Sequence, residues 1–152
     1  MSFFKLKAKR DRVDDLFSKF IRARGKWRCQ RCGRQWPDGS AGLTCSHFFG
    51  RRMESVRFDP ENCDALCMFP CHDEWENEKG IFKLRQGRDV IEYPRAYRAW
   101  KITQLGPVRF AALEVRAHTT VKKDRKMSLI YVKALRAEAK KEEGKKIVGG
   151  KV

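Results

Sequence analysis

An apolar stripe near the N-terminus gives the first clear prediction. Between residues 11 and 24, apolar side chains recur every three or four residues, at Val13, Leu16, Phe17, Phe20 and Ile21. This period places them on one face of an amphipathic helix. Gly25 is a natural stop for that helix, so we expect a helix over residues 11–24.

The middle of the chain predicts short strands around a long loop. Residues 43–49 and 65–68 are the two candidate strands, and residues 50–62 between them read as a loop. Residues 72–79 suit a helix, which Gly80 would close. Strands and helices that follow one another in this way predict a small α+β fold.

Beyond residue 80 we expect helices. Pro94 and Pro107 can each open one, because proline is tolerated at a helix start. A third candidate helix covers residues 124–143. Its apolar side is expected to hold Met127, Ile130, Tyr131, Ala134 and Leu135.

The patterns divide the chain into three parts that we expect to form one compact unit. These are an N-terminal helix (1–28), a cysteine-rich core (29–80) and a helical C-terminal extension (81–152). The polar, Gly-rich tail at 144–152 is expected to be disordered. A length of 152 residues suits a single domain.

Charge is distributed unevenly over these parts. The whole chain carries a formal charge of +16, which favours a polyanionic partner such as nucleic acid. Residues 1–28 hold 10 basic and 3 acidic side chains, residues 29–80 hold 6 and 9, and residues 81–152 hold 19 and 7. A slightly acidic core between two basic flanks suits a nuclease, because the flanks can bind phosphates while the core carboxylates accept a divalent cation.

The N-terminus lacks an apolar run long enough for a signal peptide, and no stretch is long enough to span a membrane. We therefore expect a cytoplasmic protein with no membrane partner. Thiols stay reduced in the cytoplasm, so paired cysteines favour a metal over disulfides, although a disulfide framework remains an alternative.

Four cysteines have the spacing of a zinc site. Cys29 and Cys32 form one close pair, and Cys67 and Cys71 form another. Two such pairs can hold a tetrahedral structural Zn²⁺, in the arrangement called a treble clef. The remaining cysteines, at 45 and 63, are expected to be small buried apolar residues, although either could replace a member of the quartet.

The residues between the cysteine pairs suggest hydrolytic chemistry. A neutral His47 could take a proton from water as a general base, although a histidine near a strand is often an ordinary, partly buried residue. Asn62 could hydrogen-bond the loop that presents this imidazole, or be a plain turn residue.

A second, harder metal has candidate ligands in the expected helix after Cys71. His72 and Glu76 lie four residues apart and could share Mg²⁺ or Mn²⁺, although Glu76 could equally be a surface carboxylate. Three arginines are candidate phosphate ligands, because guanidinium binds phosphate through two hydrogen bonds. They are Arg51, Arg52 and Arg57.

Taken in order, these motifs resemble the zinc-containing HNH endonucleases of the ββα-metal class. The order is Cys-x-x-Cys, Ser-His, Asp-Pro-Glu-Asn and Cys-x-x-x-Cys-His. The resemblance implies that His47 is the general base, that Asn62 orients it or helps at the metal, and that His72 binds the catalytic cation. The implied reaction is metal-assisted hydrolysis of DNA that leaves 5′-phosphate and 3′-hydroxyl ends.

A closer likeness covers about residues 11–80 and is to the phage NinG/Rap recombination nucleases, which are associated with branched DNA. It rests on the helix before the first cysteine pair and on Cys-Ser-His-Phe-Phe-Gly-Arg-Arg. Two positions depart from these families. Ser46 stands where many HNH enzymes have a metal-binding Asp, and His72 stands where NinG-like proteins often have Asn.

The leading hypothesis is therefore an HNH DNA endonuclease, for which branched or recombination-intermediate DNA is a candidate substrate. A phage-encoded protein of this kind would work in the host cytoplasm, and cutting a four-way junction symmetrically would favour a homodimer. The alternative is a zinc module that binds nucleic acid without cutting it. Such a module needs the cysteines and the basic flanks, but not His47.

Overall fold

The computed structural model describes the backbone of residues 10–73, 81–86, 89–94 and 96–148. Its elements make a small α+β fold, as the sequence predicts. In order they are α1 (Arg12–Arg24), β1 (Leu43–His47), β2 (Cys63–Cys67), β3 (Ile81–Gln86), β4 (Asp89–Pro94), α3 (Ala96–Leu105), α4 (Pro107–Ala117) and α5 (Arg125–Val148). Short 3-10 turns lie at Glu54–Val56 and Pro60–Asn62, and a π-helical turn lies at Met68–His72.

Helix α1 begins at a strong N-terminal cap. The Asp11 carboxylate accepts hydrogen bonds from the backbone N–H groups of Val13 and Asp14, and the Asp14 carboxylate accepts one from the N–H of Asp11. This capping box satisfies N–H groups that a helix start otherwise leaves without partners. The predicted apolar stripe faces the core, where Val13, Phe17, Phe20 and Ile21 are buried and Leu16 packs against them.

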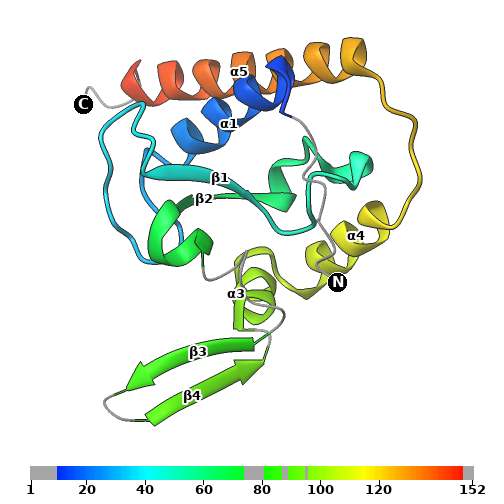
Figure 1. Ribbon diagram of the computed structural model, residues 1–152. Helices are drawn as coiled ribbons and strands as arrows, with labels where there is room; N and C mark the ends of the chain where they lie inside the picture. The colour runs from blue at the N-terminus through cyan, green and yellow to red at the C-terminus, as the bar shows by residue number, and fades with distance from the viewer. Residues whose placement is uncertain (1–9, 74–80, 87–88, 95, 149–152) are drawn as a thin grey trace.

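Strands β1 and β2 form an antiparallel pair at the centre of the molecule, between α1 and α3 (Figure 1). Their register runs from Leu43 opposite Cys67 to His47 opposite Cys63. Residues opposite one another share a face of the sheet. Helix α1 covers the face that carries these four residues, with the ring of Phe17 centred 6.4 Å from the His47 imidazole.

Helix α3 meets the other face of this strand pair. Ser46 and Asp64 lie opposite one another there, and both are buried. The Lys101 ammonium of α3 donates to the Asp64 carboxylate at 2.7 Å, and its side chain is 1% exposed. Burial raises the pKa of Asp64, an effect that the charge of Lys101 opposes.

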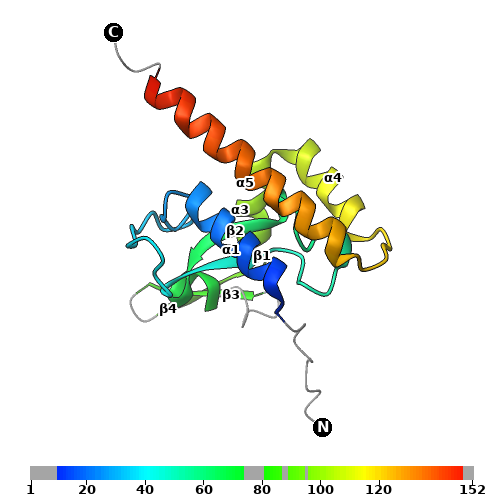
Figure 2. The same cartoon turned by 90° about the horizontal axis from the view of Figure 1, so that it is seen from above.

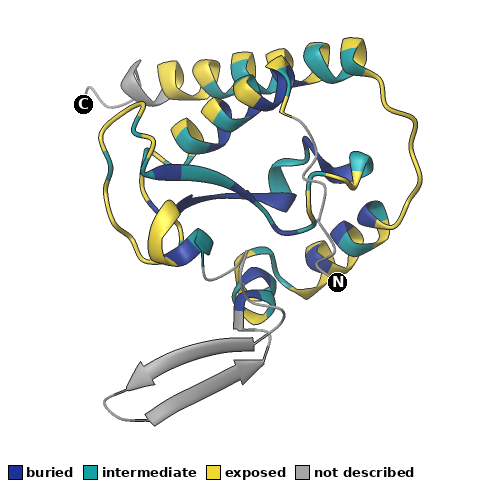
Figure 3. Cartoon of the chain, viewed as in Figure 1, coloured by how far each residue is buried: buried dark blue, intermediate teal, exposed yellow. Residues whose placement is uncertain are grey.

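Helix α5 lies along α1, and its C-terminal end projects from the rest of the molecule (Figures 1 and 2). The helix was predicted correctly, but most of its expected apolar side faces away from the core. Met127, Ile130 and Tyr131 are 60%, 61% and 47% exposed. The residues that pack inward are Leu129, Val132, Leu135 and Ala139. Exposed surface accordingly runs along most of this helix (Figure 3).

The C-terminal extension is not entirely helical, which corrects the sequence prediction. Strands β3 and β4 pair from Ile81 opposite Pro94 to Gln86 opposite Asp89, where we expected helix. Alternating apolar residues on either side of a glycine were the missed signal. Helices α3 and α4 do follow Pro94 and Pro107, as predicted. At the other end, α5 continues to Val148, so the expected disordered tail is helical as far as that residue.

Acidic residues of the N-terminal half pair with basic residues of the C-terminal helices. Besides the pair formed by Lys101, Arg125 of α5 bridges to Asp11 and Glu54, and Arg116 of α4 bridges to Asp59 and Glu61. Part of the acidic core and part of the basic flank therefore neutralise one another. Among the described residues, no helix is both long and apolar enough to cross a membrane.

Candidate functional site

The first cysteine pair lies in a tight loop just after α1. The backbone N–H of Gly33 donates to the Cys29 carbonyl at 2.9 Å, and the N–H of Cys29 donates to the Arg34 carbonyl at 2.9 Å. Gly33 has a φ of 76°, a left-handed conformation that glycine adopts without strain. The glycine after the second cysteine thus lets the loop close and directs both thiols to one side.

The second cysteine pair comes from the end of β2 and the turn that follows it. Cys67 is the last residue of β2, and Cys71 lies in the turn Met68–His72. The N–H of Met68 donates to the Gly42 carbonyl at 2.7 Å, which holds the start of this turn against the chain leading into β1. Both cysteines are buried, at 0% and 3% exposure.

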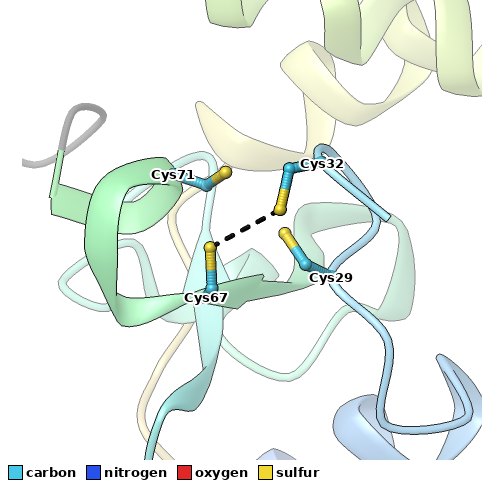
Figure 4. Close-up of side chains that lie close together, drawn as sticks. All are labelled: Cys29, Cys32, Cys67 and Cys71. Carbon is cyan, nitrogen blue, oxygen red and sulfur yellow. Dashed lines mark hydrogen bonds between the residues drawn. The ribbon is translucent and has the colours of Figure 1, made fainter. Parts of the chain in front are cut away.

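The four thiols meet with the dimensions of a metal site. All four sulfur atoms lie within 4.8 Å of one another, and the Sγ atoms of Cys32 and Cys67 are 3.7 Å apart (Figure 4). A tetrahedral zinc with Zn–S bonds of about 2.3 Å requires about 3.8 Å between sulfurs. Cys29, Cys32, Cys67 and Cys71 could therefore hold a metal such as zinc, as their spacing predicts.

The pKa values of these thiols are shifted in different directions. Burial alone would raise the pKa of Cys29, but backbone N–H groups of Cys32, Cys67 and Arg31 lower it to about 7. Burial raises the pKa values of Cys67 and Cys71. A metal at this site would therefore have to displace protons, which makes its affinity dependent on pH.

His47, the predicted base, ends β1 and is partly buried. Its Nε2 lies 2.9 Å from the carbonyl oxygen of Arg57. A carbonyl can only accept, so Nε2 carries the hydrogen and the lone pair of the neutral ring is on Nδ1. Burial lowers the pKa of His47 to about 4, with the positive charge of Arg51 contributing. The imidazole is therefore neutral at neutral pH.

Asn62 holds the loop that supplies this carbonyl. Its side-chain N–H group donates to the carbonyls of Phe49 and Val56 at 2.9 and 3.0 Å, and its side-chain oxygen accepts from the N–H of Phe49 at 2.8 Å. These are hydrogen bonds to the loop of the kind we expected from the sequence. Asn62 is fully buried, so it joins the two ends of the loop around Arg57.

Two cysteines that the sequence predicts to be small buried apolar residues lie close to His47. Cys45, Cys63 and His47 offer ligand atoms that all lie within 4.8 Å of one another. The i, i+2 spacing of Cys45 and His47 was a usable signal, because such residues share a face of a strand. Only the register of β2 shows that Cys63 faces His47.

Arg57 was predicted to be a phosphate ligand, but its side chain is buried. Its side chain is 5% exposed and pairs with the buried Asp14 carboxylate at 2.6 Å. The cost of burying both charges is offset only if they stay together. Arg57 therefore does not present its guanidinium at the surface, as a phosphate ligand must. Arg52 is exposed and Arg51 is partly exposed, so both remain candidates.

The expected site for a harder cation is described only in part. His72 lies next to Cys71 and is partly exposed, whereas Glu76 and most of its expected helix lie outside the described residues. Within the described part of the chain, two groups of three or more side chains could hold a metal, and neither includes a carboxylate. Neither group suits Mg²⁺ or Mn²⁺, because these ions prefer oxygen ligands.

Comparisons with models of protein families, with curated proteins and with solved structures found no match to this chain.

Proposed function

We propose that this protein is a DNA endonuclease of the HNH type, stabilised by zinc and using His47 as its general base. One arrangement carries the proposal: Asn62 fixes the loop whose Arg57 carbonyl accepts the Nε2 hydrogen of His47. That arrangement orients the ring and places the lone pair of the neutral ring on Nδ1. A general base needs both properties.

Zinc bound by the four cysteines would be structural. It would join the loop after α1 to the end of β2, and through β2 to the strand that carries His47. Closed sites of this kind contribute on the order of 10–16 kcal/mol of binding free energy in small zinc modules. Catalysis would then depend on residues of the β1–β2 strand pair.

In the proposed reaction, Nδ1 of His47 takes a proton from a water molecule as the water oxygen attacks phosphorus. The bond from phosphorus to the 3′ oxygen breaks, and the 3′ oxygen gains a proton, leaving 5′-phosphate and 3′-hydroxyl ends. A pKa of about 4 keeps the imidazole unprotonated before each turnover. It also makes the imidazole a weak base, because burial outweighs the hydrogen bond to the Arg57 carbonyl, which by itself raises the pKa.

DNA is the proposed partner because the chain has a formal charge of +16. Branched DNA is the more specific form of the proposal and extends the resemblance to recombination nucleases. A homodimer belongs to this form, because two strands of a junction must be cut symmetrically. The exposed Met127, Ile130 and Tyr131 of α5 are available for such contacts.

The test is DNA cleavage by the wild type and by a His47→Ala variant, with a His118→Ala variant as the matched control. His118 is exposed on the chain after α4. Linear, nicked, flap and four-way-junction DNA are each incubated with Mg²⁺ or Mn²⁺, and with EDTA in parallel. We expect His47→Ala to lose cleavage while the metal in its four-cysteine site and its DNA affinity stay near wild type, and we expect His118→Ala to cut normally.

Two results would contradict this proposal. Cleavage by His47→Ala at the wild-type rate would remove His47 from the mechanism. A wild-type protein that binds DNA but cuts no substrate with either cation would support the alternative, a zinc module that only binds nucleic acid.

A further inference from the structure

The face of β1 and β2 beneath α1 carries a second group of metal-ligand side chains. In the strand register His47 lies opposite Cys63, and Cys45 lies two residues before His47 on the same face. Their ligand atoms all fall within 4.8 Å of one another. Because β2 rises about 3.3 Å per residue, Cys63 is about 13 Å from Cys67, so this group is separate from the four-cysteine cluster.

The imidazole in this group is held as metal-binding histidines usually are. Such a histidine commonly donates its second ring N–H to a backbone carbonyl or carboxylate, which fixes the tautomer and the ring orientation. Nε2 of His47 makes this contact with the Arg57 carbonyl, at 2.9 Å. The lone pair of Nδ1 can then serve as the ligand.

We propose that Cys45, His47 and Cys63 form a second zinc site in this protein. Two thiolates and an imidazole suit a soft or borderline ion such as Zn²⁺ and are poor ligands for Mg²⁺. Three protein ligands leave a fourth position for water, as in many zinc sites that are not purely structural. Cys63 is fully buried, whereas Cys45 and His47 are partly exposed.

This site has a consequence for cleavage that rests on the proposed function. Zinc on Nδ1 of His47 occupies the lone pair that would accept the proton from water. Zinc in excess of the four-cysteine site would therefore inhibit the nuclease. Zinc bound by the four-cysteine site would sustain the fold, and zinc bound here would block the base.

Metal stoichiometry tests the site without reference to activity. The reduced, metal-free protein is titrated with Co²⁺ in the presence of a phosphine reductant. Visible absorption bands report tetrahedral cobalt, and near-ultraviolet bands report its bonds to thiolate. We expect the wild type and His118→Ala to bind two ions. We expect Cys45→Ala, Cys63→Ala and His47→Ala to bind one, with the bands of the four-cysteine site retained as proof of folding.

The outcomes are separable from those for the nuclease. A wild type that binds one ion, or a Cys45→Ala variant that still binds two, would overturn the second site whether or not the protein cuts DNA. If the wild type cuts DNA, excess zinc should inhibit it, and Cys45→Ala, which keeps His47, should resist that inhibition by at least tenfold in zinc concentration. Equal sensitivity of the two proteins would also overturn the site.

Discussion

Replacing Arg57 with methionine removes a cation from a buried network and is expected to destabilise the fold. The network joins the start of α1 to the turn at Glu54–Val56 and to the start of α5. Arg57 pairs with Asp14 and lies near Asp11 and Glu54, and Arg125 bridges the last two. Without Arg57, Asp11 and Glu54 keep their bridges to Arg125, whereas Asp14 loses the guanidinium that pairs with it.

The expected loss follows from the burial of the central pair. Arg57 donates from Nε to Asp14 Oδ1 at 3.0 Å and from Nη2 to Oδ2 at 2.6 Å, with the two side chains 5% and 4% exposed. Removing one partner of a buried pair costs about 3–5 kcal/mol. Asp14 keeps its hydrogen bond from the N–H of Asp11, so we expect about 3 kcal/mol. In a domain of this size that is on the order of 10 °C in melting temperature.

Urea unfolding at a fixed free zinc concentration measures the loss, because ligand binding otherwise changes the apparent stability. Arg52→Met, at an exposed arginine, is the matched control and should change stability by less than about 0.5 kcal/mol. Adding Asp14→Asn to Arg57→Met removes the orphaned charge and should recover most of the loss. If Arg57→Met unfolded like the wild type but bound DNA more weakly, Arg57 would act at the surface and the buried pair would be wrong.

Three further predictions concern zinc, pH and DNA binding. Removing the metal with a chelator should abolish most of the cooperative unfolding transition seen by circular dichroism. A Cys32→Ser change, at the exposed thiol of the four-cysteine cluster, should do the same, and a normal transition would count against a structural metal. The pKa of His47 is about 4 in the folded protein, against an ordinary value of 6.5. The fold therefore favours the neutral imidazole, so the contribution of His47 to stability is complete above about pH 6.5 and is lost as pH falls towards 4. The full contribution is roughly 3 kcal/mol. The stability gap between wild type and His47→Asn should shrink by roughly 2 kcal/mol from pH 7 to pH 4.5, and a constant gap would refute the shift. Changing Arg51 and Arg52 to glutamine should lower the slope of log affinity for DNA against log salt by about two, and an unchanged slope would exclude them as phosphate ligands.

The local elements of this fold were predictable because short spacings determine them. The apolar stripe of α1 recurs with the helical period, and proline and glycine mark the starts of the later helices. The cysteine pairs were recognisable because each pair has the spacing of a metal ligand set. The β3–β4 strand pair was missed because each strand is only six residues long, and a short apolar run does not by itself distinguish a strand from a helix.

The sequence by itself determined the two cysteine pairs, the helix before them and the strongly basic composition on which the proposal of a polyanionic partner rests. Only the tertiary structure decided that Arg57 faces Asp14 across 43 residues, and that Cys63 faces His47 across the strand pair. The reason is that a side chain's spacing fixes its position on its own helix or strand, whereas register and packing choose what lies opposite. A basic residue next to a candidate site can thus be a buried structural ion, and a cysteine outside the zinc quartet can be a ligand.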